Sequence, residues 1–381
     1  MKSCIVVGTY LSPGQTFVNR HIQHLFGGAT CVIADRLTEE TPEDGRFFEM
    51  SPEDRPATDK LIRPFARGLN HLRHGSSRMP YGSARRGALR FLARHKPDMI
   101  LSEFGPQGVA IAPIANAAGI PVFCYFRGSD ASSRIRHPHV QRAYKKMMPR
   151  LAGVFSVSQF LLDNLASVGV SHPNSVVIPS GVDVRRFVPG EKLPGSCLAV
   201  GRFVEKKTPL MTIRAFAEAA QRNPQAQLTM IGDGELYEPA KALVSELGLQ
   251  DRVSLPGALP HEEVRAHLER TEVFVQHSVT ARNGNTEGLP TSIQEAMAAG
   301  CVVVSTRHAG IPEAVREGQT GYLVEEHDEA GYTEAVARAV ALPPEQKRQM
   351  GEEARRIAIA DYDNAELLKK LEAEIRRTLG R

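Results

Sequence analysis

The alternation of short apolar runs with longer helical patterns is the feature that most constrains the fold of this chain. Runs rich in Val, Ile and Phe recur along the 381 residues, and most are followed by a segment with apolar residues at helical spacing. Buried strands that alternate with helices are typical of parallel sheets covered by helices on both faces. The sequence therefore predicts an α/β fold made of doubly wound sheets.

The strand-like runs form two sets. The first set covers residues 3–10, 31–35, 98–104, 120–126, 153–158 and 175–180, and the second begins at residue 195 and ends at residue 324. Residues 181–195, rich in Gly and Pro, are predicted to be the linker between them. We expect two Rossmann-like domains, residues 1–188 and 189–361, that face each other across a cleft. Residues 362–381 are predicted to form a charged amphipathic helix that could pack back on the first domain.

The net charge of +4 conceals an uneven distribution, because residues 1–190 carry +10 and residues 191–381 carry −6. Two segments account for the basic excess. Lys60–Lys96 contains ten basic residues and no acidic one, and Arg134–Arg150 contains six, again with no acidic residue. A positive field of this kind attracts nucleic acid, an anionic membrane or a phosphorylated substrate.

The pattern of the first basic segment favours a membrane over nucleic acid. Leu61, Ile62 and Phe65 are interleaved with the basic residues at near-helical spacing, and Pro64 is expected in the first turn of the helix. A basic amphipathic helix is typical of a protein that lies on an anionic membrane. A solvated, Arg-rich helical pair is the alternative. Nucleic acid is not expected as a partner, since interleaved stacking aromatics and nucleic-acid-binding motifs are absent from the sequence.

Other features exclude secretion and a membrane span. The first apolar run is too short for a signal peptide, and the longest uncharged stretch, residues 104–126, contains three prolines. The five cysteines are scattered and odd in number, which favours buried thiols in a reducing compartment. We expect a cytoplasmic protein, with peripheral association on the inner face of the membrane as a candidate arrangement.

Residues 278–300 contain the most informative motif. Gly288, Leu289 and Pro290 lead into a predicted helix with Pro290 at its first position, and the helix amides would form an anion site suited to phosphate. Glu287 precedes this turn, and Glu295 lies five residues after Pro290, about 7 Å along a helix. A diphosphate at the helix start would place a sugar near Glu287 and a ribose near Glu295. Taken alone, the spacing also fits a surface acid beside an amphipathic helix.

Two further clusters follow predicted strands. Arg202 and Lys207 come directly after the strand that ends at Gly201, where two cations suit a diphosphate leaving group. Gly232 and Gly234 form a strand-to-helix turn at which the backbone must approach a ligand closely. Each cluster alone is commonplace in proteins.

Together these clusters resemble a known family. The stretches VGRFVEKK, LTMIGDGELYEPAKALVSELGLQDRVSLPG and EGLPTSIQE are similar, in order and interval, to motifs of retaining glycosyltransferases of the GT-B fold, the group 1 branch that uses nucleotide sugars. The resemblance is dense over residues 178–328 and thinner in the first half. It implies two Rossmann-like domains of the GT-B type.

The resemblance also implies roles for single residues. Glu287 would bind hydroxyls of the transferred sugar, and Arg202 and Lys207 would bind and stabilise the leaving diphosphate. The donor would be bound further by Glu295 at the ribose and by Gly288, Leu289, Pro290, Gly232 and Gly14 around the phosphates and sugar. Arg127 stands where the family has a His expected to contact the donor sugar, so an imidazole role is absent there.

The activity implied is transfer of a hexose-type sugar, with retained configuration, from a nucleotide-diphosphate sugar to a glycan or lipid-linked acceptor in envelope or exopolysaccharide synthesis. Neither metal nor cofactor is expected: Asp-x-Asp is absent at the strand ends, and the paired histidines lack carboxylate or Cys companions. A catalytically silent nucleotide- or glycan-binding GT-B module is an alternative, as is a sugar-nucleotide epimerase or hydrolase. A nicotinamide oxidoreductase is rejected, because Gly-x-Gly-x-x-Gly does not follow the first strand.

Overall fold

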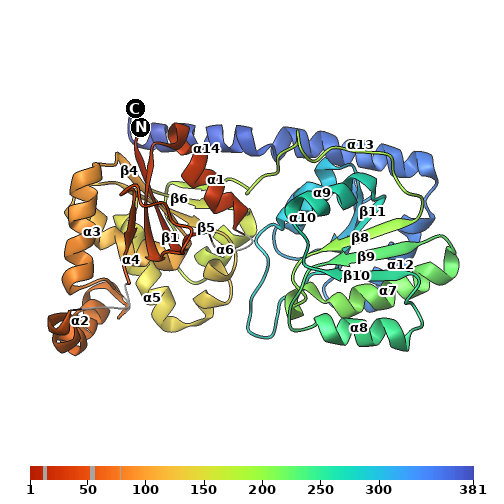
Figure 1. Ribbon diagram of the computed structural model, residues 1–381, viewed down its shortest axis with the longest axis horizontal. Helices are drawn as coiled ribbons and strands as arrows, with labels where there is room; N and C mark the ends of the chain where they lie inside the picture. The colour runs from red at the N-terminus through yellow and green to blue at the C-terminus, as the bar shows by residue number, and fades with distance from the viewer. Residues whose placement is uncertain (12–14, 52–55, 78) are drawn as a thin grey trace. The chain divides into compact units, whose positions relative to one another are not determined.

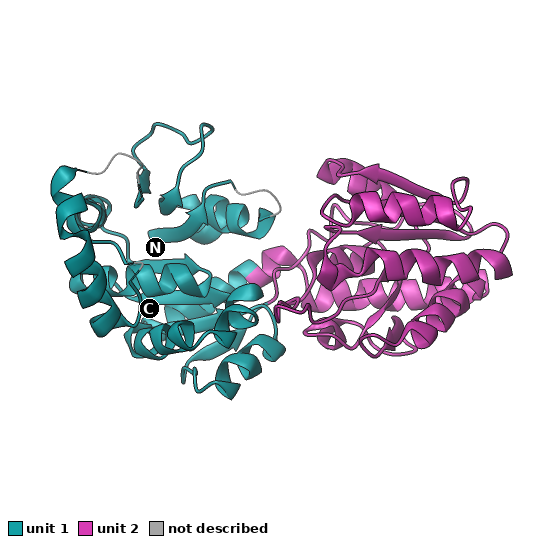
Figure 2. Cartoon of the chain, turned by 90° about the horizontal axis from the view of Figure 1, so that it is seen from below, with its two compact units in different colours: residues 1–178, 368–381 teal, residues 179–367 magenta. Residues whose placement is uncertain are grey.

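The computed structural model describes residues 1–11, 15–51, 56–77 and 79–381, and divides the chain into two compact units (Figures 1 and 2). Unit 1 comprises Met1–Ile178 together with Leu368–Arg381, and unit 2 comprises Pro179–Leu367. Each unit contains one parallel sheet with helices packed on it, so the predicted α/β doubly wound fold is confirmed.

The sheet of unit 1 has seven strands in the order β3-β2-β1-β4-β5-β6-β7. Their bounds are β1 Ser3–Thr9, β2 Thr30–Arg36, β3 Phe47–Glu49, β4 Met99–Glu103, β5 Val122–Phe126, β6 Gly153–Ser156 and β7 Ser175–Val177. The strand order changes direction between β1 and β4, which pair directly. In open parallel sheets, ligands bind outside the carboxyl ends of the strands at such a switch point.

The helices of unit 1 connect these strands and cover both faces of the sheet. They are α1 Thr16–His24, α2 Ala57–His74, α3 Gly82–His95, α4 Gly105–Ala117, α5 Pro138–Met147 and α6 Gln159–Ser167, with short turns η1 Leu25–Gly28, η2 Ser129–Ala131, η3 Arg134–Arg136 and η4 Met148–Arg150. The last helix, α14 Asn364–Thr378, enters unit 1 at Leu368. There Glu372 accepts the backbone N–H of Phe26 at 2.7 Å, which fastens this helix to the unit.

Unit 2 repeats the architecture with six strands in the order β10-β9-β8-β11-β12-β13. They are β8 Ser196–Val200, β9 Gln227–Ile231, β10 Val253–Gly257, β11 Val273–Gln276, β12 Val302–Thr306 and β13 Gly321–Val324. Its helices are α7 Pro209–Arg222, α8 Tyr237–Glu246, α9 His261–Arg270, α10 Thr291–Ala298, α11 Ile311–Ala314, α12 Glu329–Ala341 and α13 Pro344–Asp361, with the turn η5 Glu205–Lys207. The switch point here lies between β8 and β11.

The core of unit 2 consists of two apolar layers, one on each face of the sheet. Val273 and Val275 of β11 point into the layer that α7, α8 and α12 complete. Phe274, between them in sequence, points into the layer formed with α9, α10 and α13. Successive side chains of a strand point to opposite faces, so a strand covered on both sides is apolar throughout.

Two local expectations are wrong. Val182, Val184 and Phe187 are buried in the second layer of unit 2, so residues 181–195 belong to a folded core and are not a linker. Gly and Pro mark irregular backbone, which a packed segment uses as readily as a connector does. Pro64 lies inside α2 and not in its first turn, because the helix already begins at Ala57 after the capping Pro56.

The cysteines lie where their apolar surroundings in the sequence predict. All five cysteines are buried free thiols. Within the described part of the chain, none of the helices is both long and apolar enough to cross a bilayer.

Candidate functional site

The predicted donor residues of unit 2 meet at the carboxyl ends of its central strands. Gly201 and Arg202 follow β8, Gly232 follows β9, and the long loop that carries Glu287 joins β11 to α10. Parallel strands end at the same edge of a sheet, so turns distant in sequence come together there. The chain thereby assembles its cations, its carboxylate and a helix start within one site.

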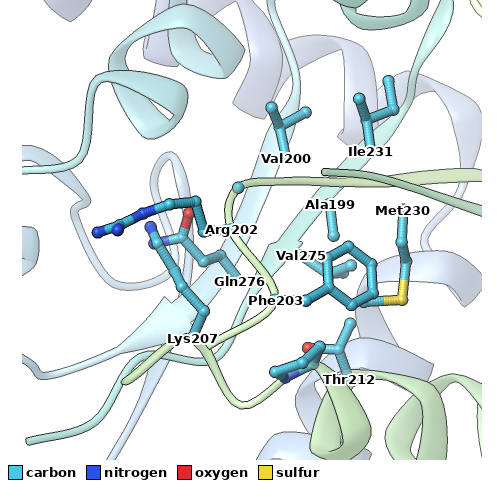
Figure 3. Close-up of a pocket in the computed structure, with 12 residues that line it drawn as sticks. Ala199, Val200, Arg202, Phe203, Lys207, Thr212, Met230, Ile231, Val275 and Gln276 are labelled. Carbon is cyan, nitrogen blue, oxygen red and sulfur yellow. The ribbon is translucent and has the colours of Figure 1, made fainter. Parts of the chain in front are cut away.

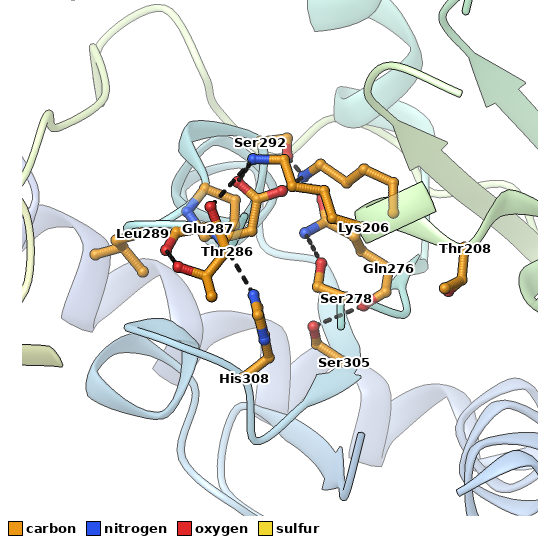
Figure 4. Close-up of polar contacts among 12 residues, drawn as sticks. Lys206, Thr208, Gln276, Ser278, Thr286, Glu287, Leu289, Ser292, Ser305 and His308 are labelled. Carbon is orange, nitrogen blue, oxygen red and sulfur yellow. Dashed lines mark hydrogen bonds and ion pairs between the residues drawn. The ribbon is translucent and has the colours of Figure 1, made fainter. Parts of the chain in front are cut away.

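Glu287 lies between two lysines at the centre of this site. Its carboxylate is 3.2 Å from Lys206 Nζ (Figure 4) and 3.1 Å from Lys207 Nζ. Burial alone would raise the pKa of Glu287, but the charges of Lys207 and Lys206 outweigh it and lower the pKa to about 2. Burial lowers the pKa of Lys207, and Glu287 opposes that effect. The cluster therefore holds one ionised carboxylate with two cations, a local charge of +1.

Lys206 was missed by the sequence reasoning, which assigned only its neighbour. Its Nζ donates to the Thr286 carbonyl at 3.3 Å, and its own carbonyl accepts the Val279 N–H at 3.0 Å. Both lysines belong to η5, so one short turn directs two ammonium groups at one carboxylate. The adjacent Lys-Lys pair in the sequence was the signal that could have identified it.

Arg202 and Lys207 line a pocket at the end of β8, together with Gly201 and Gln276 (Figure 3). Arg202 is exposed, whereas the Lys207 side chain is only 15% exposed. The positive charge of Arg202 is felt at Lys207 and helps to lower its pKa, after the larger effect of burial. Two cations at one pocket mouth provide a binding surface for an anion.

Gly232 is needed for close packing of the protein on itself. A Cβ atom there would lie 1.9 Å from the Gly201 carbonyl oxygen, and one at Gly234 would lie 2.5 Å from the Phe203 carbonyl oxygen. Their φ angles of 147° and 151° also disfavour other residues. The close approach that the sequence suggested is therefore made by the turn after β8, which carries Arg202.

The start of α10 also lies at this site. The helix begins at Thr291, so Pro290 is the capping residue and not, as expected, the first helical one. Pro290 has no side-chain acceptor, so the first N–H groups of α10 are not capped by its side chain. Gly288 is tied by its carbonyl to the Gly310 N–H at 2.9 Å, and Leu289 is buried. Gly300, with φ of 72°, ends the helix as predicted.

Polar side chains of β11, of β12 and of the loop after β11 support the start of α10. Ser292 Oγ donates to Gln276 Oε1 at 3.0 Å, and Gln276 Nε2 donates to Ser278 Oγ at 3.0 Å (Figure 4). Ser305 Oγ donates to the Gln276 carbonyl at 2.7 Å. This network fixes the first turn of α10 against the sheet.

Glu295 lies on α10, partly exposed, and its Oε1 is 3.2 Å from His261 Nε2. The hydrogen bond to Glu295 raises the pKa of His261, and burial works against it. Glu295 and Glu287 thus differ in environment, since the first has a half-exposed imidazole beside it and the second two ammonium groups. His261, at the start of α9, was not identified from the sequence.

A second buried cluster lies in unit 1 at the ends of β4 and β5. Arg127 Nε and His21 Nδ1 each lie 2.6 Å from a carboxylate oxygen of Glu103. The guanidinium also stacks on the rings of Phe17 and Tyr125, at 4.2 and 3.8 Å from their centroids. Burial would raise the pKa of Glu103, but Arg127 and His21 lower it to about 2. Arg127 is thus a buried, charge-paired group, with 3% of its side chain exposed.

One predicted residue and one class of site need separate mention. Gly14 lies outside the described residues. Over residues 1–11, 15–51, 56–77 and 79–381, the structure holds no group of three or more His, Cys, Asp or Glu side chains arranged to bind a metal ion.

Comparisons with known proteins place this arrangement in context. The family model described as "Glycosyl transferases group 1" matches residues 189–357, and the model described as "Glycosyltransferase Family 4" matches residues 40–186. WcaL of Escherichia coli K12, a glycosyltransferase assigned to colanic acid biosynthesis, is 30% identical over 73% of this chain and 71% of its own. AmsK of Erwinia amylovora, an amylovoran biosynthesis glycosyltransferase, is 32% identical over 53% of this chain and 51% of its own.

Solved structures show the same fold. HepE of Anabaena, in complex with UDP and glucose, has a TM-score of 0.77 at 16% identity, covering 99% of this chain and 100% of its own. Sucrose-phosphate synthase of Thermosynechococcus elongatus has a TM-score of 0.75 at 17% identity, covering the whole of both chains. The predicted GT-B fold is confirmed.

Proposed function

Since the chain belongs to the group 1 glycosyltransferases, we propose that it moves a hexose-type sugar from a nucleotide-diphosphate sugar to a glycan or lipid-linked acceptor. The observation that carries this proposal is the ionised Glu287 held between Lys206 and Lys207, beside the uncapped start of α10. A carboxylate of this kind suits sugar hydroxyls, while free amides and ammonium groups suit a diphosphate. The site therefore matches both parts of the donor.

The donor is proposed to bind with its diphosphate at the α10 amides and beside Arg202 and Lys207. Its ribose hydroxyls would be bound by Glu295, which lies about one and a half turns further along the helix. Glu287 would accept hydrogen bonds from the transferred sugar. Structures of HepE with UDP and glucose support a nucleotide-sugar donor for this fold.

The proposed chemistry is substitution on one face of the sugar. The bond from the anomeric carbon to the phosphate oxygen breaks, and a bond to the acceptor oxygen forms on the same face. The acceptor proton moves to the leaving phosphate oxygen, so the configuration is retained and atoms balance without an enzymatic nucleophile. Lys207 and Arg202 stabilise the charge that develops on the diphosphate, which is the largest contribution that such a site makes.

The acceptor is proposed to belong to envelope or exopolysaccharide synthesis. WcaL and AmsK, whose names assign them to two exopolysaccharides, support this choice. Acceptors of such pathways are held at a membrane, so the enzyme is proposed to work in the cytoplasm at the inner membrane face.

Helix α2 provides the surface that would hold the enzyme there. Leu61, Phe65 and Leu72 project from one side of it with exposed fractions of 80, 76 and 73%. The side that packs on unit 1 is polar: Asp59, the one fully buried residue of this helix, accepts the N–H and hydroxyl of Ser83. The apolar stripe therefore faces outward, the reverse of a helix that packs on a core.

The charges beside this stripe support an anionic membrane as its proposed partner. At 100° per residue, Lys60, Arg67 and His71 flank one edge of the stripe, and Arg73 lies beyond the other. Exposed apolar side chains with basic residues on both flanks are typical of helices that lie at a lipid interface.

Donor choice and transfer are tested together. A thermal-shift panel of UDP, GDP and ADP sugars identifies the donor, since a bound donor raises the melting temperature once its concentration exceeds Kd. Transfer to a lipid-linked acceptor is then followed by mass, and the anomeric configuration of the product by NMR. Binding without transfer to any acceptor would favour a silent module, and release of free sugar or an isomerised donor would favour a hydrolase or an epimerase.

The membrane surface is tested by co-sedimentation with vesicles. We expect binding to vesicles containing about one-third anionic lipid, weakened by salt, and little binding to neutral vesicles. The double variant Leu61→Ser with Phe65→Ser should lose binding but keep activity on a water-soluble acceptor. Equal binding by the double variant would rule out α2 as the membrane surface.

A further inference from the structure

A buried histidine behind Glu287 connects three loops of the donor site. The backbone N–H of Glu287 donates to His308 Nε2 at 3.0 Å (Figure 4), and His308 Nδ1 lies 2.6 Å from Glu326 Oε1. The His308 side chain is fully buried. Glu326 in turn accepts the backbone N–H of Thr280 at 2.6 Å. The sequence analysis assigned no role to His308, Glu326 or Thr280.

The partners of His308 determine its tautomer. A backbone amide can only donate, so Nε2 must carry the lone pair, and the proton must sit on Nδ1. The ionised Glu326 favours that proton position, because it accepts the Nδ1–H. Burial lowers the pKa of His308, and Glu326 opposes this effect. Both influences leave one neutral tautomer with a single arrangement of donors and acceptors.

The connected segments come from neighbouring strand ends. His308 follows β12, Glu326 follows β13, and Thr280 lies in the loop that joins β11 to α10 and carries Glu287. A second hydrogen bond joins the same turns, from the Gly310 N–H to the Gly288 carbonyl at 2.9 Å. The backbone is therefore fastened on both sides of the Glu287–Gly288 peptide. Such supports determine how accurately a side chain is placed at a reacting centre.

We propose that His308 is a positioning residue for Glu287, and that Glu326 holds His308 in the tautomer that this role requires. The proposal rests on the proposed function, because it assumes that Glu287 binds the transferred sugar. Glu287 reaches the donor with its carboxylate, and His308 acts on its backbone from behind. Without this support the carboxylate would keep its charge but lose its fixed position between Lys206 and Lys207.

The arrangement also makes a pH-dependent device. The charged or titratable groups that act on His308 are Glu326 and Glu287, which favour its protonation, and Lys206, which opposes it. His277 is close enough for the two imidazoles to influence each other. A proton on Nε2 would point at the Glu287 N–H and break that hydrogen bond. Protonation of His308 in acid should therefore release the Glu287 loop.

Two substitutions at His308 separate the effect of its hydrogen bonds from the effect of its volume. His308→Phe keeps the ring and removes both nitrogens, whereas His308→Gln keeps an acceptor near the position of Nε2. We expect His308→Phe to lower kcat about 10- to 100-fold, and His308→Gln to restore most of that loss. The acid limb of the kcat profile should shift to lower pH in His308→Gln, since glutamine does not titrate. His172→Gln is the matched control, because His172 also bonds to backbone groups but lies in unit 1, away from the donor site.

Measurements on the folded protein keep the proposal testable if His308→Phe fails to fold. In protein labelled with 15N-histidine, the signal that disappears in His308→Gln should show a proton on Nδ1 and a bare Nε2. A proton on Nε2 would overturn the proposal, as would wild-type kcat in His308→Phe or a Gln variant as slow as the Phe variant. Glu287→Gln distinguishes a failure of the proposed donor site from a failure of the positioning role of His308. If it transfers sugar at the wild-type rate, the proposed donor site is wrong, and if it is inactive while His308→Phe is normal, only the positioning role fails.

Discussion

Glu287 in unit 2 and Glu103 in unit 1 are both buried carboxylates with a pKa lowered to about 2, but the charged groups around them differ. Glu287 is paired with two lysines that remain partly exposed, so the cluster carries an excess positive charge at a pocket. Glu103 is paired with one arginine and a histidine whose pKa burial lowers, so that cluster is close to neutral. Its arginine is enclosed by two aromatic rings. An excess charge at a surface can bind an anion, whereas a balanced buried charge stabilises the fold.

The largest effect on stability is expected from breaking the balanced pair. Glu103→Gln would leave the Arg127 guanidinium buried without its counter-ion, which costs about 3–5 kcal/mol in free energy of unfolding. Denaturant unfolding of the variant measures this loss. Asp98→Asn, at an exposed ion pair with Arg381, is the control and should change stability by less than about 1 kcal/mol.

The same pair predicts how stability depends on pH. The folded-state pKa of Glu103 is lowered to about 2, so its contribution is present above the unfolded value near 4.5 and is lost as pH falls toward 2. Glu103→Gln should flatten that part of the stability profile. An unchanged profile would show that Glu103 is not the carboxylate responsible.

The largest effect on activity is expected from removing a lysine from the positively charged cluster around Glu287. Lys207→Ala removes a cation that faces the proposed leaving group, and should lower kcat/KM about 100- to 1,000-fold. The fold should survive, because Lys206 still pairs with Glu287. Steady-state kinetics and thermal unfolding check the two statements. A large loss of stability with little loss of activity would mean that Lys207, like the buried Arg127, supports the fold and does not bind the leaving group.

A smaller effect on stability is expected from replacing Arg127 of unit 1 by another cation. Arg127→Lys loses the planar stacking on Phe17 and Tyr125, and should lower stability by about 1–3 kcal/mol. The donor KM should change less than about threefold, because a uniform change in donor binding would appear in KM. A tenfold rise in KM at unchanged stability would instead favour the donor contact that the family resemblance implies for this position.

The smallest effect is a shift in a pH profile. Burial lowers the pKa of Lys207, and Glu287 partly restores it. Activity should therefore fall on the alkaline side below the ordinary lysine value of about 10.4, as Lys207 loses its proton. In Glu287→Asp, where the carboxylate retreats from Lys207, residual activity should fall at still lower pH. A limb that does not move would show that another group titrates.

The sequence was sufficient for the fold, and local motifs in it marked residues that the structure brings together in unit 2. Strand runs covered on both faces are apolar throughout, so β8, β11 and β12 were evident, and Glu287, Arg202 and Lys207 follow such strands or introduce a helix. The start of α10 was misplaced by one residue, because Pro290 has a φ of −59°, which a helix would accept, but an extended ψ of 129°.

The remaining residues depend on contacts that no local pattern records. His308 and Glu326 are separated by 18 positions and meet only because β12 and β13 lie side by side. Glu103 ends the apolar strand β4, and no local pattern marks it as half of an ion pair. Its partner Arg127 is 24 positions away and directly follows the neighbouring strand β5. Residues 181–195 were misread for the converse reason, since their composition suggests a connector and only the packing of Val182 and Phe187 shows a core segment.

The reversed polarity of α2 has a consequence for how such an enzyme can change. Because its attachment to the body of unit 1 is polar and its apolar residues face outward, the outer stripe can be rewritten without disturbing a hydrophobic core. Under the membrane role proposed for this stripe, the surface on which the enzyme works is therefore set by residues other than those of its donor site. Exchanging a few outward residues of α2 would then move the same site to another surface, or release it into solution.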